Sequence, residues 1–188
     1  MFLETERLAL RKFQETDFAD VCEFVMDPER NRMMGNYEVN SADDARDLLE
    51  WFLHGEKRAY AIVYKENGKV IGDLTVYDSP PVESLPQLAG KTGRALSFSI
   101  SRAYRRKGLV TEAVTAVIRH LFEVEGVDYV NSGYLDFNAP SRELHQKLGF
   151  TYLTTQGFRY EDGPELTSIE MILWRKQGWS CNLKEHFI

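Results

Sequence analysis

The succession of a strand, a long helix and a second strand between residues 95 and 137 constrains the fold of this chain most strongly. Apolar side chains recur at helical spacing from Leu109 to Glu125, which predicts an amphipathic helix that ends near Gly126. Residues 95–101 and 129–137 on either side have the pattern of strands. A helix that connects two strands is typical of a sheet with some parallel pairing.

The other predicted elements are a strand and two helices near the start, a hairpin around Asn67-Gly68, and a helix with two strands near the end. They cover residues 8–13, 16–26, 41–52, 59–64, 70–77, 140–148, 150–155 and 168–174. The order β-α-α-β-β-β-α-β-α-β-β predicts an α/β (α+β) fold, in which helices cover both faces of a mixed, mainly antiparallel sheet. We expect one domain over residues 1–176, a long surface loop at 79–93, and a tail of uncertain structure at 177–188.

The composition limits the function classes. No apolar run is long enough to cross a membrane, and the start lacks the apolar core of a secretory signal, so we expect a cytoplasmic protein. Cys22 and Cys181 are too few and too far apart for a disulfide framework, and no residue cluster predicts a metal site. Residues 1–57 hold 14 acidic and 7 basic side chains, a net charge of −7, and the rest of the chain has a net charge of +1.

A short basic segment precedes the long helix: Tyr104-Arg105-Arg106-Lys107-Gly108-Leu109-Val110. The N-terminus of a helix offers free N–H groups and a partial positive charge, and Gly108 permits a close approach to the backbone. One basic segment on an acidic protein favours a small phosphorylated ligand over a nucleic acid. The alternative is a turn glycine in a solvated basic turn, and both the P-loop and the dinucleotide glycine patterns are absent.

A second polar cluster is predicted at the start of the short helix. Asn138 has the position of an N-cap, and Asn138, Ser141 and His145 share one helix face beside the apolar Leu144 and Leu148, which we expect to face the core. The three polar side chains line a cleft in one interpretation and form a solvated helix face in the other.

The two segments together resemble the GNAT acyltransferase superfamily. Residues 104–113 look like its motif A, and Asn138-x-x-Ser141 followed by Lys147-Leu148-Gly149-Phe150 is similar to its second conserved segment. The opening Glu4-Thr5-Glu6-Arg7-Leu8-Ala9-Leu10-Arg11 resembles the branch that acetylates the N-termini of ribosomal proteins, the RimJ/RimL type. The likeness extends over roughly residues 3–175.

The resemblance implies acetyl-CoA as cosubstrate and a splayed cleft in a mostly antiparallel twisted sheet. Pantetheine would pair with the strand at Phe98, Ser99 and Ile100, and Asn138 would bond the pantetheine arm. The pyrophosphate would lie on the backbone N–H groups of residues 106–110. These cradle residues are Arg106, Lys107, Gly108, Leu109 and Val110, with Arg105 beside them. Val110 departs from the small residue usual at its place, but the expected contact is its backbone amide.

The implied reaction is direct attack of a neutral amine on the thioester, which needs a proton acceptor for the ammonium and a proton donor for the leaving thiolate. For the donor we favour Ser141, and His145 is the alternative, because it occupies the place of a tyrosine in many members of the family. The glutamate that many members carry on the strand at Ala95-Leu96-Ser97 is absent here. Asp73, Glu38 or a chain of water molecules remain open as the base.

The acidic first third of the chain suggests a cationic acceptor. Asp43, Asp44, Asp47 and Glu50 lie close together on the second predicted helix, although a solvated helix face explains them as well. A protein N-terminus, a polyamine and an aminoglycoside remain open as acceptors. We expect no nucleic-acid or membrane partner, and an oligomer is possible. The rival function is an acyl-CoA-binding module without catalytic activity.

Overall fold

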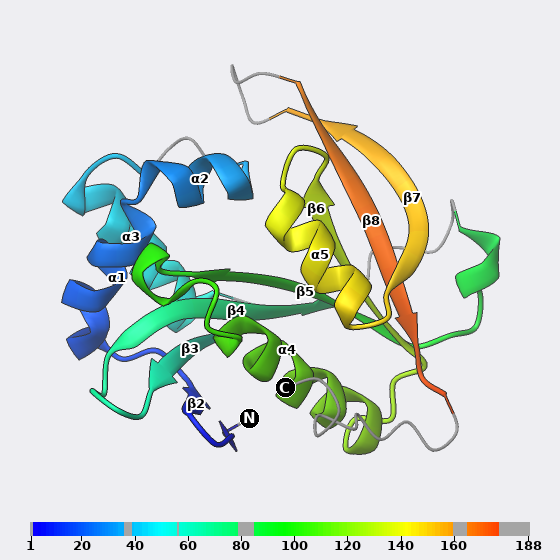
Figure 1. The fold of residues 1–188 in the computed structure, drawn as a ribbon, viewed down its shortest axis with the longest axis horizontal. Coiled ribbons are helices and arrows are strands. Elements are labelled where there is room, and N and C mark those ends of the chain that lie inside the picture. Colours follow the sequence, from blue (N-terminus) through cyan, green and yellow to red (C-terminus); the bar gives the residue numbers. More distant parts are fainter. Residues whose placement is uncertain (1, 36–38, 56, 79–84, 160–164, 177–188) are drawn as a thin grey trace.

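The computed structural model describes residues 2–35, 39–55, 57–78, 85–159 and 165–176, and Figure 1 shows its arrangement. An eight-stranded sheet has the strand order β1-β2-β3-β4-β5-β6-β8-β7. The strands are β1 (Leu3–Glu4), β2 (Leu8–Arg11), β3 (Arg58–Tyr64), β4 (Val70–Asp78), β5 (Gly93–Ile100), β6 (Tyr129–Leu135), β7 (Thr151–Phe158) and β8 (Leu166–Trp174). The helices are α1 (Phe18–Val25), α2 (Pro28–Met34), α3 (Ala42–His54), α4 (Leu109–Glu123) and α5 (Ala139–Lys147). Of the strand pairs described, β5–β6 is parallel and the others are antiparallel, which confirms the predicted mixed sheet.

The parallel pair is incomplete. Its register runs from Gly93 opposite Tyr129 to Leu96 opposite Ser132 and then stops, although β5 continues to Ile100. The outer edges of both strands remain paired, β5 with β4 and β6 with β8. Ser132 Oγ donates to the backbone oxygen of Leu96 at 2.9 Å where the pairing ends. The two strands therefore diverge beyond this point, as the splayed cleft implied by the family resemblance requires, and we call the opening the β5–β6 gap.

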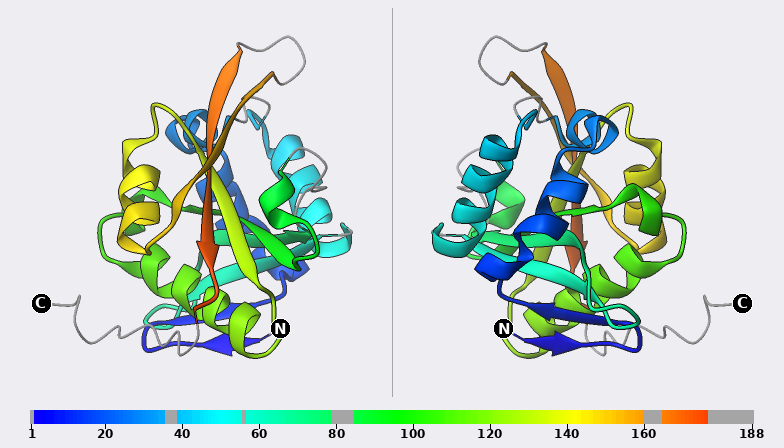
Figure 2. Two further views of the ribbon diagram at one scale, coloured as in Figure 1. Left: turned by 90° about the vertical axis from the view of Figure 1, so that its right-hand side faces the viewer. Right: turned by 90° about the vertical axis from the view of Figure 1, so that its left-hand side faces the viewer.

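Helices cover both faces of the sheet, as Figure 2 shows. The apolar stripe of α4, which includes Ala113, Val117 and Leu121, is buried in one core cluster with side chains of β2 to β6 and β8. A second cluster joins α1 and α3 to β3 and the start of β4 through residues such as Phe24, Leu49 and Ala61. Within the described residues no helix has the length and apolar character of a membrane span.

The helix α2 was missed by the sequence analysis. Asp27 caps it, since its Oδ1 accepts from the N–H of Glu29 at 3.0 Å; Pro28 opens its first turn, and Gly35 ends it at φ 71°. These start and stop signals are typical of a helix. The segment has no apolar stripe, because it buries the polar side chains of Arg30 and Asn31 instead, and a search for apolar periodicity therefore passes over it.

The predicted loop at 79–93 is only partly described. Pro86–Leu88 forms one turn of 3₁₀ helix, and Leu88 is buried in a small cluster with Tyr129 and Ile172. Residues 79–84 and the predicted tail at 177–188 lie outside the described residues.

Candidate functional site

A cavity of about 800 Å³ occupies the β5–β6 gap. Its walls are the diverging ends of β5 and β6, the segment 104–111 before and at the start of α4, the first turns of α5, and α2. Most of the predicted site residues line it: Phe98, Ser99, Ile100, Arg105, Arg106, Gly108, Leu109, Val110, Asn138 and Ser141. Lys107 and His145 are not among the lining residues. The volume falls in the range of small-molecule and cofactor sites.

The segment between β5 and α4 has an unusual backbone. Arg106 has φ 63° and Gly108 has φ 75°, so two positions in three residues adopt the left-handed conformation. An L-residue such as Arg106 adopts it at a cost of about 1–2 kcal/mol. Left-handed residues directly before a helix N-terminus commonly present backbone N–H groups to an anion, so residues 106–110 are a candidate anion site. Strain of this kind is typical of functional sites.

Neighbouring charges hold this segment in place. Arg105 is half-buried and pairs with Asp27 at 3.2 Å and with Glu29 at 3.1 Å, both near the start of α2. Arg7 donates to the backbone oxygen of Lys107 at 2.9 Å. The side chains of Arg106 and Lys107 are exposed.

The N-terminal segment is fixed to the first turn of α4 through Glu112. Thr5 Oγ1 donates to Glu112 Oε1 at 2.5 Å, and Arg7 donates from its backbone N–H at 2.9 Å and from Nε at 2.7 Å. Burial opposes ionisation of Glu112, but these hydrogen bonds and the charge of Arg7 outweigh it, so its pKa lies below the ordinary value. Two residues of the opening motif, Thr5 and Arg7, therefore fix the N-terminal segment to the first turn of α4, next to the candidate anion site.

Asn138 and Ser141 lie at the start of α5 on the other wall. Asn138 Oδ1 accepts from the N–H of Ser141 at 3.1 Å, so Asn138 is the predicted N-cap. Its Nδ2 donates to the backbone oxygen of Met33 at 3.1 Å and ties α5 to α2. Both ends of the Asn138 amide thus have protein partners. Ser141 is half-buried and lines the cavity.

His145 is in the core and not on the cleft face. Its side chain is 1% exposed and lies against the rings of Phe98, Tyr134 and Phe150. Its Nδ1 lies 2.7 Å from the backbone oxygen of Ser141 and donates there, while Nε2 is buried without a partner among the described residues. Burial lowers the pKa of His145, and the bond to Ser141 offsets this only in part.

The predicted core stripe of α5 is confirmed at Leu148, which packs against the main core cluster, and is wrong at Leu144. Leu144 is half-buried and lines the cavity, whereas its neighbour His145 takes the core position that the sequence analysis gave to Leu144. The ring of His145 packs against other aromatic rings as an aromatic side chain does, which is why a hydropathy pattern misplaces it.

Of the two side chains predicted as candidate bases, the structure describes Asp73 but not Glu38. Asp73 is 4% exposed and does not line the cavity. Its Oδ1 lies 3.1 Å from Nη2 of the buried Arg30 and also accepts from Ser99 Oγ, while Arg30 donates to Ser99 Oγ at 2.9 Å. The carboxylate therefore has two partners already. Glu38 lies outside the described residues.

Among the described residues, the carboxylates that do line the cavity are Glu29, Glu143 and Glu170. Sequence reasoning missed all three as site residues, as well as Arg30, Met33 and Met34 from α2. Glu170 belongs to no recognisable sequence motif, and it reaches the cavity because β8 pairs with β6 in the sheet.

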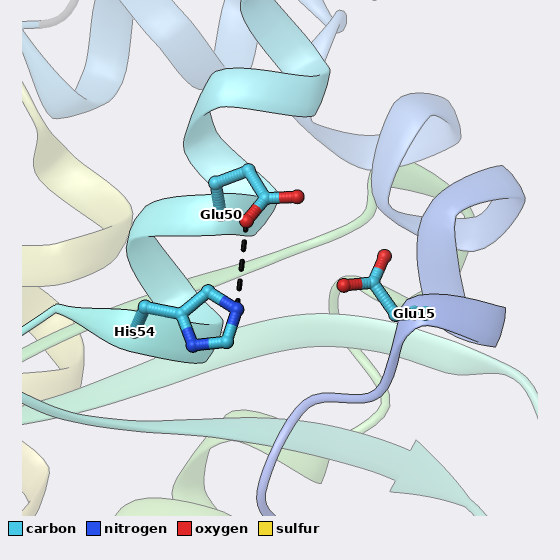
Figure 3. Close-up of side chains that lie close together, drawn as sticks. All are labelled: Glu15, Glu50 and His54. Carbon is cyan, nitrogen blue, oxygen red and sulfur yellow. Dashed lines mark ion pairs between the residues drawn. The ribbon is translucent and has the colours of Figure 1, made fainter.

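The acidic side chains of α3 lie elsewhere. Asp43, Asp44, Asp47 and Glu50 are not among the residues that line the cavity, and Asp44 forms a capping box with Ser41. Figure 3 shows Glu50 and His54 on α3 next to Glu15. The carboxylate oxygens and the imidazole nitrogen that could bind a metal lie within 4.8 Å of one another. His54 pairs with Glu50 at 3.5 Å, and Glu15 pairs with Arg46 at 3.6 Å. Exposed acidic groups often gather without an ion, so this group supports no metal assignment.

The sequence matches a known family model, the Acetyltransferase (GNAT) domain, over residues 7–151. An uncharacterised N-acetyltransferase of Bacillus licheniformis is 28% identical over 153 residues, which cover 79% of this chain and 81% of the relative. An N-alpha-acetyltransferase of Sulfurisphaera tokodaii is 29% identical over 117 residues, which cover 58% of this chain and 67% of the relative.

Solved structures share the fold. A GNAT-family acetyltransferase of Bacillus anthracis matches with a TM-score of 0.78 at 16% identity, over 93% of this chain and 98% of that chain. A ribosomal-protein alanine acetyltransferase of Vibrio fischeri matches with a TM-score of 0.62 at 18% identity, over 94% and 100% of the two chains. At these identities the likeness establishes the fold.

Proposed function

The chain belongs to the GNAT acetyltransferase family, and on this premise we propose that it transfers the acetyl group of acetyl-CoA to a primary amine by direct attack. The observation that carries the proposal is the β5–β6 gap, which leads from unpaired strand edges to the left-handed segment at Arg106 and Gly108. The extended pantetheine arm of CoA matches the unpaired strand edges, and its pyrophosphate matches the segment at Arg106 and Gly108.

The donor would lie with pantetheine beside Phe98, Ser99 and Ile100, where the β6-facing edge of β5 has no strand partner among the described residues. The pyrophosphate would accept hydrogen bonds from the backbone N–H groups of residues 106–110. Arg106 and Lys107 add positive charge near these groups. Asn138 would contribute its remaining carbonyl lone pair to the pantetheine arm, since Oδ1 accepts one bond within the protein.

The reaction moves two protons from the acceptor nitrogen. The ammonium first gives one proton to a base, which passes it to solvent. The lone pair of the neutral amine then forms the N–C bond at the thioester carbon, and the C–S bond breaks with its electrons on sulfur. The second proton leaves nitrogen and ends on the thiolate as CoA departs, so amide, CoA thiol and one solvent proton are formed.

Ser141 is the proposed contact of the leaving sulfur. It lines the cavity, and its hydroxyl can pass a proton from the nitrogen side to the sulfur without holding a charge. His145 supports this role poorly, because its ring lies outside the cavity lining and burial disfavours the imidazolium form.

We further propose a cationic acceptor, and favour the N-terminal α-amine of a protein. Three carboxylates line the cavity and attract an ammonium. The N-alpha-acetyltransferase relative supports an α-amine acceptor, and the opening motif at Thr5 and Arg7 supports the finer assignment to the branch that acetylates ribosomal-protein N-termini. We also propose that residues 1–176 form one catalytic domain and that the protein acts in the cytoplasm.

One assay tests the function. The protein is mixed with acetyl-CoA and a panel of short peptides, polyamines and aminoglycosides, and release of free thiol is followed. We expect turnover with at least one α-amine peptide and thermal stabilisation by CoA. Stabilisation by CoA without turnover on any amine would favour the binding module, and no stabilisation would contradict both functions.

A further inference from the structure

The sheet places one carboxylate at the apex of the β5–β6 gap. Glu170 on β8 lies directly opposite Gly133 on β6. A Cβ at Gly133 would come within 2.5 Å of Glu170 Oε1, so the carboxylate occupies the space that a side chain at residue 133 would need. Gly133 does not have a positive φ, and its place here is explained by this close approach.

The face on which Glu170 lies follows from strand geometry. The last β5–β6 pair is Leu96 and Ser132, and Leu96 is buried in the cluster on the α4 face. Side chains alternate along a strand, so the next β6 residue, Gly133, and its partner Glu170 face the other side. Ser99 faces this side as well, where it contacts Arg30 of α2. The carboxylate therefore stands at the point where the strands part, on the α2 side of the sheet.

The surroundings of Glu170 leave it able to take a ligand. Ser168 Oγ donates to Oε1 at 2.6 Å, and no cation of the described residues forms an ion pair with the carboxylate. Glu29, by contrast, is held by Arg105 at 3.1 Å. The other charged groups that line the cavity are Arg30, Arg105, Arg106, Glu143 and Lys147. Arg30 is already neutralised by Asp73.

We propose that Glu170 binds the ammonium of the acceptor and takes its first proton. This inference rests on the proposed function and names its base. The carboxylate accepts the proton, the neutral nitrogen attacks the thioester carbon, and Glu170 later returns the proton to solvent. Ser168 orients Oε1 and leaves Oε2 for the ammonium, while Gly133 keeps the path open. The acceptor enters along α2, past Met33 and Met34.

The central test is Glu170→Gln, assayed by thiol release with acetyl-CoA and two probes, a short peptide with a free N-terminus and spermine. We expect kcat/KM near neutral pH to fall by about 10²-fold or more, the usual contribution of a general base. The loss should shrink as pH approaches the pKa of each amine, about 8 for the peptide and about 10 for spermine, because solution then supplies the neutral amine. CoA binding should stay unchanged, as measured by calorimetry.

Two further variants separate catalysis from structure. Gly133→Ala places a methyl group against Oε1 and should lower kcat, with little further effect when it is added to Glu170→Gln. Glu123→Gln removes one carboxylate from the exposed end of α4 and should leave the rate unchanged. A Glu170→Gln enzyme within threefold of wild type and with the same pH profile would overturn the role of Glu170 alone. CoA binding without turnover by the wild type would overturn the proposed function and this inference together.

Discussion

The buried pair between Arg30 and Asp73 allows a quantitative prediction about α2. The two side chains are 5% and 4% exposed, and Nη2 lies 3.1 Å from Oδ1. At this distance, with an effective dielectric constant of about 20, their attraction is about 5 kcal/mol. Asp73→Ala leaves the guanidinium buried without a counter-charge, for which a loss of about 3–5 kcal/mol is typical. For a chain of this size we expect the midpoint of thermal unfolding to fall by about 6–20 °C.

The assay is urea unfolding followed by circular dichroism, with the double variant Arg30→Met/Asp73→Ala as control. Removing both charges avoids the buried unpaired cation, so the double variant should recover at least about 2 kcal/mol of the loss. A loss below about 1 kcal/mol in the single variant, or a double variant as unstable as the single one, would refute the view that this ion pair fixes α2 to the sheet.

Three further predictions concern the anion site, the proton donor and the pH dependence of stability. Gly108→Asp should weaken CoA binding at least tenfold in calorimetry, because it adds strain at φ 75° and a negative charge at the phosphates. The control Gly90→Asp adds similar strain at φ 70° outside the site and should leave CoA affinity unchanged; equal affinities of the two variants would contradict binding of the phosphates at Gly108. Ser141→Ala should lower kcat at least tenfold, while His145→Phe should keep kcat within about threefold; the reverse order of rates would make His145 the donor. His145→Phe should also lose less stability than the wild type on acidification from about pH 7 to about pH 5, because the lowered pKa of His145 makes this histidine harder to protonate in the folded state than in the unfolded state. The lowered pKa of Glu112 adds stability at neutral pH, and this stability is lost as pH falls below about 4.5 through the folded-state pKa. In this acidic range the urea midpoint of Glu112→Gln should therefore fall less steeply with pH than that of the wild type, and parallel curves for the two proteins would count against the prediction.

Much of the fold was predictable from local patterns. Apolar periodicity located α1, α3 and α4, and Asn67-Gly68 located the β3–β4 hairpin. The end of the β5–β6 pairing at Leu96 and Ser132 follows no local pattern and was expected only from the resemblance to a family. The helix α2 was missed, because its buried residues, Arg30 and Asn31, are polar and are stabilised by distant partners.

The candidate site was predictable to a similar extent. The segment at Arg106 and Gly108 and the N-cap at Asn138 are short-range features, and the structure brings them to one cavity. Glu170 reaches that cavity only through its pairing with Gly133 and the missing side chain there. Contacts of this kind depend on the sheet register, which a single sequence does not specify. His145 was misplaced because its hydropathy is that of a polar residue, whereas its packing is that of an aromatic one.

The most direct test of the central claim is a crystal structure of the protein with CoA. We predict that the pyrophosphate lies within about 2.7–3.2 Å of backbone nitrogens in residues 106–110. The pantetheine arm should lie in the β5–β6 gap beside Phe98–Ile100, with its sulfur near Ser141 and the apex at Gly133. CoA bound outside the gap, or an arm that leaves the β5 edge unpaired, would contradict the account.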